Sequence, residues 1–228
     1  MCSRYSLTSP PEAVRDYFKV GGDDDFPPRY NVAPTQPIPI VRVSAGGVRE
    51  LTLVRWGLIP GWVKDPSQFT TLLNARSESV IEKPSFRSAM KYRRCLVPAD
   101  AFYEWTGPKT DKRPYMIRPR SGGPIAFAGL WEHWQGADGS EIETAAIITT
   151  SPNATLQPIH DRMPVILHPS VFDAWLDVRA LPAEAATHLL RPAPDELLEI
   201  FAIGKAISNP RAEGLALQQP VPEQGRLV

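Results

Sequence analysis

The alternation of apolar and polar positions along the chain predicts more strands than helices. Five segments are dominated by apolar and β-branched residues and flanked by residues that favour turns, which is typical of strands. They predict strands at 39–43, 48–56, 114–118, 124–130 and 145–150. The first helical signal is the run Ser9-Pro10-Pro11-Glu12, which has the spacing of a capping box with Pro at the first helical position. It predicts a helix through 13–18 that ends at glycines 21 and 22.

Three further short helices are predicted, one beginning at Ser151, one at 170–176 and one at 182–190. Strands and helices do not alternate regularly, so the order of elements argues against a doubly wound parallel sheet. It favours the α+β class, with a bent, barrel-like and mostly antiparallel β core and a few short helices at its periphery. No internal repeat and no Pro-rich linker divides the chain. The sequence therefore predicts a single domain over 1–228, with roughly the last 15 residues as a tail.

Composition narrows the class of protein. Pro accounts for 25 of 228 residues, roughly twice its usual share of about 5%, which excludes a helical bundle because Pro interrupts helices. Basic and acidic residues number 25 each, which excludes a chain that coats nucleic acid by bulk charge. Charge is separated locally, however, because the segment 76–94 holds six basic and two acidic residues. This segment is interpreted either as a solvated face or as an anion-binding groove.

Targeting signals and cysteine usage predict a cytoplasmic protein. No apolar run approaches the about 18 residues that a membrane span needs, and no apolar segment follows a basic start as in a signal peptide. The two cysteines, Cys2 and Cys95, do not make a disulfide framework. The sequence contains no recognisable metal-ligand spacing and no nucleotide phosphate loop, so we expect no metal and no cofactor.

Cys2 is a candidate nucleophile because removal of Met1 would make it the first residue of the chain. It would then carry an α-amine and a thiol on adjacent carbons, with ordinary pKa values of about 7.7–8.0 and about 8.5. Such a 1,2-aminothiol condenses with an aldehyde, first through the amine to an imine and then through the thiol to a five-membered thiazolidine ring. The alternative is an ordinary residue near a frayed terminus.

Three further places along the chain could carry acid–base or binding chemistry. His160 lies in a loop and has the pKa range of a general acid or base, although a lone loop His is also typical of a structural role. Glu104, between two aromatic residues, is either a surface residue on a strand edge or a buried acid with a raised pKa. Asn74 and Arg76 would share one face of an extended segment, where they could bind substrate and phosphate or cap their own loop.

Eight stretches of the chain occur in the order typical of one protein family. They are MC with RY at 1–5, RYNVAPT at 29–35, WGLIPGW at 56–62, NAR with Glu78 at 74–78, RCLVPAD at 94–100, FYEW at 102–105, FAGLWE at 127–132, and IITT at 147–150 followed by IHDRMP at 159–164. Over 1–211 the chain therefore resembles the SOS response-associated peptidase (SRAP) family, whose members form covalent crosslinks with abasic sites in DNA.

The resemblance implies the SRAP fold, a groove that holds single-stranded DNA, and attack of Cys2 on the ring-opened aldehyde of an abasic deoxyribose. It also implies that Asn74, Glu104 and His160 complete the catalytic site. Further residues would contact the DNA, at phosphates or near splayed bases: Arg4, Arg76, Thr149, Arg162, Pro34 and Trp62. An imine that does not cyclise would give abasic-site lyase activity by β-elimination. One molecule suffices for one lesion, so we expect a monomer.

Two positions depart from the family pattern. Ser3 stands where Gly is usual, and Val63 follows Trp62 where many relatives carry a second aromatic residue. Loss of one aromatic platform would weaken base stacking, which is worth about 1–3 kcal/mol per base. Two other functions stay open: a peptidase with Cys2 as thiol nucleophile and His160 as base, and a non-covalent binding module for single-stranded nucleic acid that uses Arg and Trp side chains.

Overall fold

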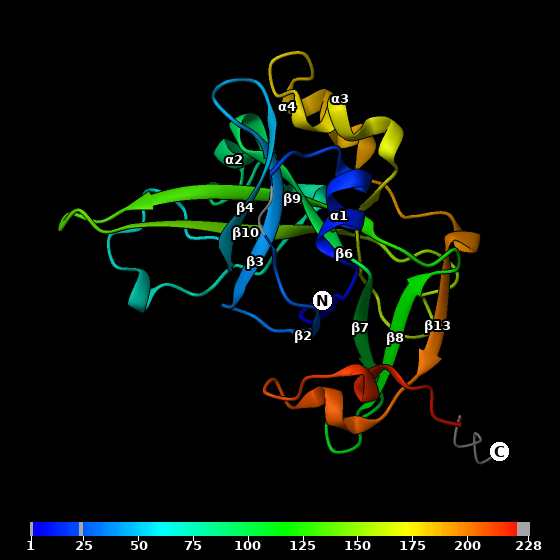
Figure 1. The fold of residues 1–228 in the computed structure, drawn as a ribbon. Helices are drawn as coiled ribbons and strands as arrows, with labels where there is room; N and C mark the ends of the chain where they lie inside the picture. The colour runs from blue at the N-terminus through cyan, green and yellow to red at the C-terminus, as the bar shows by residue number, and fades with distance from the viewer. Residues whose placement is uncertain (1, 23–24, 223–228) are drawn as a thin grey trace.

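The described strands form two β-sheets (Figure 1). The computed structural model describes residues 2–22 and 25–222. The larger sheet contains β3 (Pro37–Val43), β4 (Arg49–Trp56), β5 (Asn74–Arg76), β6 (Arg94–Ala99), β9 (Ile125–Gln135), β10 (Glu141–Thr150), β11 (Met163–Pro164) and β12 (Ile166–Leu167). The smaller sheet runs in the order β2 (Arg29–Val32), β1 (Tyr5–Leu7), β7 (Ala101–Thr106), β8 (Arg113–Pro119) and β13 (Leu198–Ala202).

Five strands of the larger sheet close into a barrel. β4 pairs with β3, β3 with β6, β6 with β9 and β9 with β10, and the ring closes where β10 pairs with β4. Only this last pairing of the five is parallel. The predicted α+β fold with a bent, barrel-like and mostly antiparallel β core is therefore confirmed. The β9–β10 hairpin is longer than the barrel and projects beyond it (Figure 1), because its two strands stay paired as far as Gln135 and Glu141.

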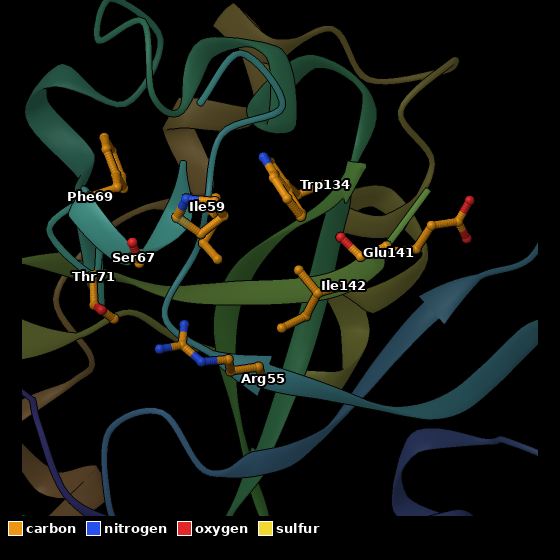
Figure 2. A pocket seen from close by; sticks show the side chains of 10 residues that line it. Arg55, Ile59, Ser67, Phe69, Thr71, Trp134, Glu141 and Ile142 are labelled. Atoms are coloured by element: carbon orange, nitrogen blue, oxygen red, sulfur yellow. The ribbon is translucent and has the colours of Figure 1, made fainter. Parts of the chain in front are cut away.

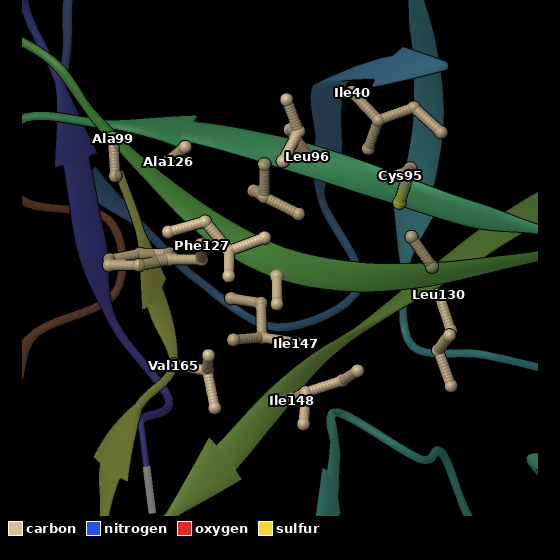
Figure 3. Close-up of a cluster of buried hydrophobic side chains, with 14 of the residues drawn as sticks. Ile40, Cys95, Leu96, Ala99, Ala126, Phe127, Leu130, Ile147, Ile148 and Val165 are labelled. Atoms are coloured by element: carbon tan, nitrogen blue, oxygen red, sulfur yellow. The ribbon is translucent and has the colours of Figure 1, made fainter. Parts of the chain in front are cut away.

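Apolar side chains fill the core around β6 and β9 (Figure 3). Every residue of β6 is buried, and α3 (Phe172–Leu176) packs against this strand through Trp175, whose indole Nε1 donates to the carbonyl of Cys95 at 2.8 Å. Gly129 on β9 lies directly opposite Cys95. A Cβ atom there would lie 2.8 Å from Cys95 Sγ and 2.9 Å from Val97 Cγ2. Glycine is therefore required for the two strands to approach at this point.

The helices are short and lie outside the barrel (Figure 1). The α-helices are α1 (Pro11–Phe18), α2 (Arg87–Tyr92), α3 and α4 (Ala183–Ala186). Single turns of 3-10 helix lie at η1 (Pro66–Gln68), η2 (Ser77–Ser79), η3 (Pro169–Val171), η4 (Thr187–Leu189), η5 (Asp195–Leu197), η6 (Lys205–Ser208) and η7 (Leu215–Gln218). Within residues 2–22 and 25–222, no helix combines the length and the apolar character needed to span a membrane.

Two helical predictions differ from the structure. α1 forms where expected, but without a capping box: the hydroxyl and backbone N–H of Ser9 both donate to Asp100, at 2.7 Å each, and the helix ends at Lys19 in the left-handed region. The helix predicted to begin at Ser151 is a series of turns instead. Asn153 organises these turns, because its side-chain Oδ1 accepts from the backbone N–H of Leu156 at 3.0 Å. In the first case the groups of Ser9 bind Asp100 and do not cap α1.

The segment 205–218, here called the C-terminal strap, packs against the smaller sheet. Asn31 on β2 is fully buried, and its Nδ2 donates to the strap carbonyls of Asn209 and Ala212 at 2.9 and 3.0 Å. Leu217 is buried, and Gln218 Nε2 donates to Ser6 Oγ at 3.0 Å. Part of the segment predicted as a tail is therefore packed, while its residues 223–228 lie outside the described ranges.

Candidate active site

Cys2 lies where the two sheets meet, three positions before the first residue of β1. Its side chain is fully buried. The edge strand β5 pairs in parallel with β10 and brings Asn74 to this point, where its Nδ2 donates to the carbonyl of Cys2 at 2.9 Å. The other amide atom, Asn74 Oδ1, is buried and has no hydrogen-bond partner among the described residues. The Asn74 amide therefore fixes the backbone of Cys2 and leaves one acceptor available beside it.

Glu104 approaches the same place from β7. The residue is only 3% exposed, and this burial raises the pKa of Glu104 from 4.5 to about 7. Burial and the charge of Glu104 together raise the pKa of the Cys2 thiol above its ordinary range. The first effect leaves a carboxyl that can donate a proton at neutral pH. The second keeps the thiol protonated, which is opposite to the lowered pKa of cysteines that attack as thiolates.

His160 faces Glu104 from the loop between β10 and β11. Its Nε2 lies 3.8 Å from Glu104 Oε2, and its Nδ1 accepts from the backbone N–H of Arg162 at 2.9 Å. With Nδ1 as acceptor, a neutral imidazole carries its proton on Nε2, directed at the glutamate. The Arg162 carbonyl at 3.2 Å and Asp161 Oδ1 at 3.1 Å from Nδ1 favour the other tautomer, so the Arg162 N–H is the contact that favours the first. Burial lowers the pKa of His160, which favours this neutral form at pH 7.

Arg162 and Thr149 form a second polar cluster beside His160. Arg162 Nη2 donates to the Thr149 carbonyl at 2.7 Å. The two terminal nitrogens of Arg162 also donate to the two carboxylate oxygens of Glu78 at 2.7 and 2.9 Å. Thr149 is buried. The cluster connects η2, β10 and the His160 loop, and Glu78 is the member to which the sequence assigned no role.

The predicted DNA contacts occupy different surroundings. Trp62 is 59% exposed and meets Phe69 edge-on at a centroid distance of 5.7 Å. Arg76 is exposed and Pro34 is half-buried. Arg4, in contrast, donates from Nη1 to Asn31 Oδ1 at 2.9 Å and to the carbonyl of Ile207 at 3.0 Å. Its guanidinium therefore joins β1 to the C-terminal strap.

The two departures from the family pattern also have defined places. Ser3 is half-buried. Val63 is 7% exposed and packs with Ile59 and Trp134, whose Nε1 donates to the Val63 carbonyl at 2.6 Å. Its side chain points away from solvent, so it presents no surface to a base. The aromatic side chain beside Trp62 is that of Phe69, seven residues along the chain, and no pattern in the sequence indicates this contact.

The basic segment 76–94 is not a uniform groove. Arg94 is buried, and its guanidinium donates to the carbonyls of Trp175, Asp177 and Leu181 at 2.6–3.0 Å. Arg93 pairs with Glu132 at 2.7 Å. Both cations stabilise the fold, since they satisfy carbonyls or a buried carboxylate. The exposed cations of the segment, such as Arg76, Lys83 and Arg87, are those available to an anion.

A pocket of about 390 Å³ lies between the 55–71 segment and the β9–β10 hairpin (Figure 2). Its described lining includes Arg55, Phe69, Trp134 and Ile142 but none of the predicted site residues. No group of three or more His, Cys, Asp or Glu side chains in the described part of the chain is arranged to hold a metal ion.

Comparisons with known proteins show which family the chain belongs to. The family model described as SOS response associated peptidase (SRAP) matches residues 1–210. Abasic site processing protein YoqW of Bacillus subtilis (strain 168) is 38% identical over 216 residues, which cover 92% of this chain and 96% of YoqW. Abasic site processing protein HMCES of Xenopus tropicalis is 28% identical over 256 residues, which cover 92% of this chain and 76% of HMCES.

A solved structure matches as well. The crystal structure of a protein from Bacteroides thetaiotaomicron has a TM-score of 0.87 and 28% sequence identity, and the match covers 96% of this chain and 100% of that one. The chain belongs to the SRAP family, which confirms the resemblance found in the sequence.

Proposed function

We propose that the chain processes abasic sites in single-stranded DNA by forming a thiazolidine crosslink through Cys2 once Met1 has been removed. One observation carries this proposal: Asn74 holds the carbonyl of Cys2, and Glu104, which faces His160, is close enough for its charge to act on the thiol. The names of the relatives supply the substrate, since YoqW and HMCES are both called abasic site processing proteins.

The α-amine of Cys2 is the first nucleophile. It adds to the C1′ aldehyde of the ring-opened sugar and gives a carbinolamine, whose hydroxyl leaves as water to give an imine. Glu104, with its pKa raised by burial to about 7, supplies the proton to that departing hydroxyl. His160 shuttles a proton from the anomeric hydroxyl to the ring oxygen when the sugar ring opens. Asn74 Oδ1, the buried acceptor beside Cys2, binds an N–H of the amine.

The thiol closes the ring in a second step. Its sulfur adds to the imine carbon while its proton passes to the nitrogen, so aldehyde and aminothiol become thiazolidine plus one water. The raised pKa of the Cys2 thiol suits this order, because the thiol stays protonated until the imine has formed. It disfavours the peptidase alternative, in which a thiolate attacks first. An imine that escapes closure loses the 3′ phosphate by β-elimination, which is abasic-site lyase activity.

Strand binding is assigned mainly to exposed side chains. Trp62 offers a stacking surface, and Arg76 offers a cation for a phosphate. The polar groups of Arg4, Thr149 and Arg162 already make hydrogen bonds within the protein, so we assign them a smaller share of the binding energy. A single molecule acts on each lesion.

The test is incubation of the processed protein with a single-stranded oligonucleotide that carries one abasic site, followed by intact-mass analysis. The expected adduct has the mass of protein plus oligonucleotide minus one water. Cys95→Ala should form it at the wild-type rate, and Cys2→Ala should form no stable adduct, because an imine without a thiol cannot close to a ring. Equal crosslinking by Cys2→Ala would refute the proposal. Salt-sensitive binding that ignores both the lesion and Cys2 would instead indicate a non-covalent binding module.

A further inference from the structure

The carboxylate of Glu78 makes contacts that the proposed chemistry does not use. Glu78 lies on η2, directly after β5, and both of its carboxylate oxygens accept from Arg162, at 2.7 and 2.9 Å. A planar carboxylate and a planar guanidinium joined by two parallel bonds fix each other's orientation as well as their separation. The contact therefore holds the side chain of Arg162 in one direction.

The backbone of Arg162 is fixed from the other side. Met163 and Pro164 follow it at once as β11, which pairs with Thr150 and Thr149 of β10. The Arg162 side chain returns to the same strand, since Nη2 donates to the Thr149 carbonyl at 2.7 Å. Glu78, Thr149 and β11 together hold Arg162 at three points.

This anchored residue is the hydrogen-bond donor to His160. The backbone N–H of Arg162 reaches His160 Nδ1 at 2.9 Å, and the Nε2 atom on the opposite side of the ring lies 3.8 Å from Glu104 Oε2. If Arg162 moved, Nδ1 would lose its donor and the ring could take its proton there. Asp161 Oδ1 already lies 3.1 Å from Nδ1, so without the Arg162 N–H it would accept a hydrogen bond from a proton on Nδ1 and favour the other tautomer.

Glu78 and Arg162 differ in their exposure to solvent. The Glu78 side chain is 53% exposed, whereas that of Arg162 is 13% exposed. Glu78 is therefore a negative charge on the surface that also carries exposed Arg76, two residues before it. A residue recruited only to bind DNA would not be acidic at this position, because it repels phosphates.

We propose that Glu78 is a positioning residue for His160, acting through Arg162 to keep the Nε2 proton of the imidazole directed at Glu104. Its consequence for catalysis rests on the proposed crosslinking function. The structure gives Glu78 two opposite effects, because its charge weakens DNA binding while its contact with Arg162 supports the reaction. Removal of the charge should therefore tighten binding and slow crosslinking.

The experiment compares Glu78→Gln with Glu82→Gln, which removes the same charge from an exposed residue four positions further along. At saturating abasic oligonucleotide we expect Glu78→Gln to crosslink about tenfold more slowly than wild type, with DNA affinity equal or higher. Glu82→Gln should keep the wild-type rate. Glu78→Asp, which retains the charge, should recover part of the rate.

Nitrogen-15 NMR of the His160 ring, recorded without DNA, tests the positioning independently of any reaction. We expect the wild type and Glu82→Gln to show the Nε2-protonated tautomer, and Glu78→Gln to show a mixture. An unchanged tautomer together with an unchanged saturated rate in Glu78→Gln would overturn the inference. If the wild type formed no crosslink at all, the proposed function would fall, while the tautomer comparison would still decide the role of Glu78.

Discussion

Cys2 and Cys95 are both completely buried in the same apolar core, yet the polar groups near them differ. Cys95 lies among the apolar side chains of the barrel (Figure 3), against Gly129 and Val97. Cys2 lies beside the amide of Asn74 and within reach of the charge of Glu104. Burial raises the pKa of both thiols. Neither exposure nor thiol acidity therefore distinguishes Cys2, the proposed nucleophile, from Cys95.

The difference lies in the groups that can handle a proton. Cys2 has an acid with a pKa of about 7 nearby and, after processing, an amine on its own α-carbon. Cys95 has neither, since its nitrogen lies within the chain and its strand is buried along its whole length. A change near Cys2 should therefore alter chemistry, and one near Cys95 should alter stability.

The largest effect is expected from adding a residue ahead of Cys2. With a Gly inserted between Met1 and Cys2, the nitrogen of Cys2 stays in a peptide bond, as Cys95's always is, and cannot form an imine. Crosslinking should fall by at least about 100-fold, the scale of losing a positioned intramolecular nucleophile. The check is intact-mass analysis with abasic oligonucleotide. Wild-type crosslinking by the extended protein would remove the distinction between the two cysteines.

Glu104→Gln should have the next largest effect. Loss of a general acid slows crosslinking by about 100-fold at pH 7. The advantage of wild type over the variant should shrink as pH rises through about 7, because Glu104 then loses the proton that it donates. The measurement is the crosslinking rate of both proteins between about pH 5.5 and about pH 8.5, a range that extends roughly 1.5 units to either side of that pKa. A constant ratio would contradict the acid role.

The same substitution should affect stability in the opposite direction. The folded-state pKa of Glu104 is raised above 4.5, so its contribution to stability is fully present below that value and is lost as pH rises through about 7. Glu104→Gln does not titrate, and it should be more stable than wild type above pH 7, by up to about 3 kcal/mol. Urea unfolding at acidic and alkaline pH measures this, and equal stability at both would show that burial does not raise the pKa.

Asn74→Ala should have a smaller effect. It removes the hydrogen bond to the Cys2 carbonyl and the buried acceptor beside it, which is worth about 1–2 kcal/mol and slows crosslinking about tenfold. The thiol and amine remain present, so the adduct should still form on long incubation. A time course by gel shift gives the rate. An unchanged rate would show that Cys2 needs no amide to hold it.

Gly129→Ala should affect chemistry least. The added Cβ would lie 2.8 Å from Cys95 Sγ, and overpacking of this kind costs about 1–3 kcal/mol of stability. Crosslinking at a temperature where the variant is folded should stay within about twofold of wild type, since nothing near Cys2 changes. Thermal unfolding measures the loss of stability, and the oligonucleotide assay measures the crosslinking rate. A large loss of rate in the folded variant would mean that the two cysteine environments are coupled.

Apolar periodicity predicted the strands with clear patterns but not the ones between them. The segments 39–43 and 48–56 correspond to β3 and β4. β6 and β7 were missed, since Pro98 and Asp100 look like a turn. In the structure Pro98 is buried within β6 and Asp100 accepts hydrogen bonds from Ser9. Tertiary contacts thus determine the conformation of this segment, although its local sequence indicates a turn.

Some residues of the candidate site could likewise be predicted from the sequence, and others could not. Cys2, Glu104 and His160 could be singled out by chemical type, and the structure brings them together with Asn74. The role of Arg94 could not be predicted, because a basic run indicates exposure while its guanidinium is buried among carbonyls. Arg4 was expected to face phosphates and also binds the C-terminal strap. Which cation is used within the fold depends on carbonyls distant in sequence.

The hydrogen bond between Arg4 and Ile207 can form only late in the synthesis of the chain. These residues are 203 positions apart, so a ribosome adding about 5–20 residues per second completes the strap about 10–40 s after the first residues have been joined. Throughout that interval the start of the chain lacks its final partner. The proposed function requires removal of Met1, and removal during synthesis would act before the strap exists, whereas Cys2 is fully buried in the folded chain.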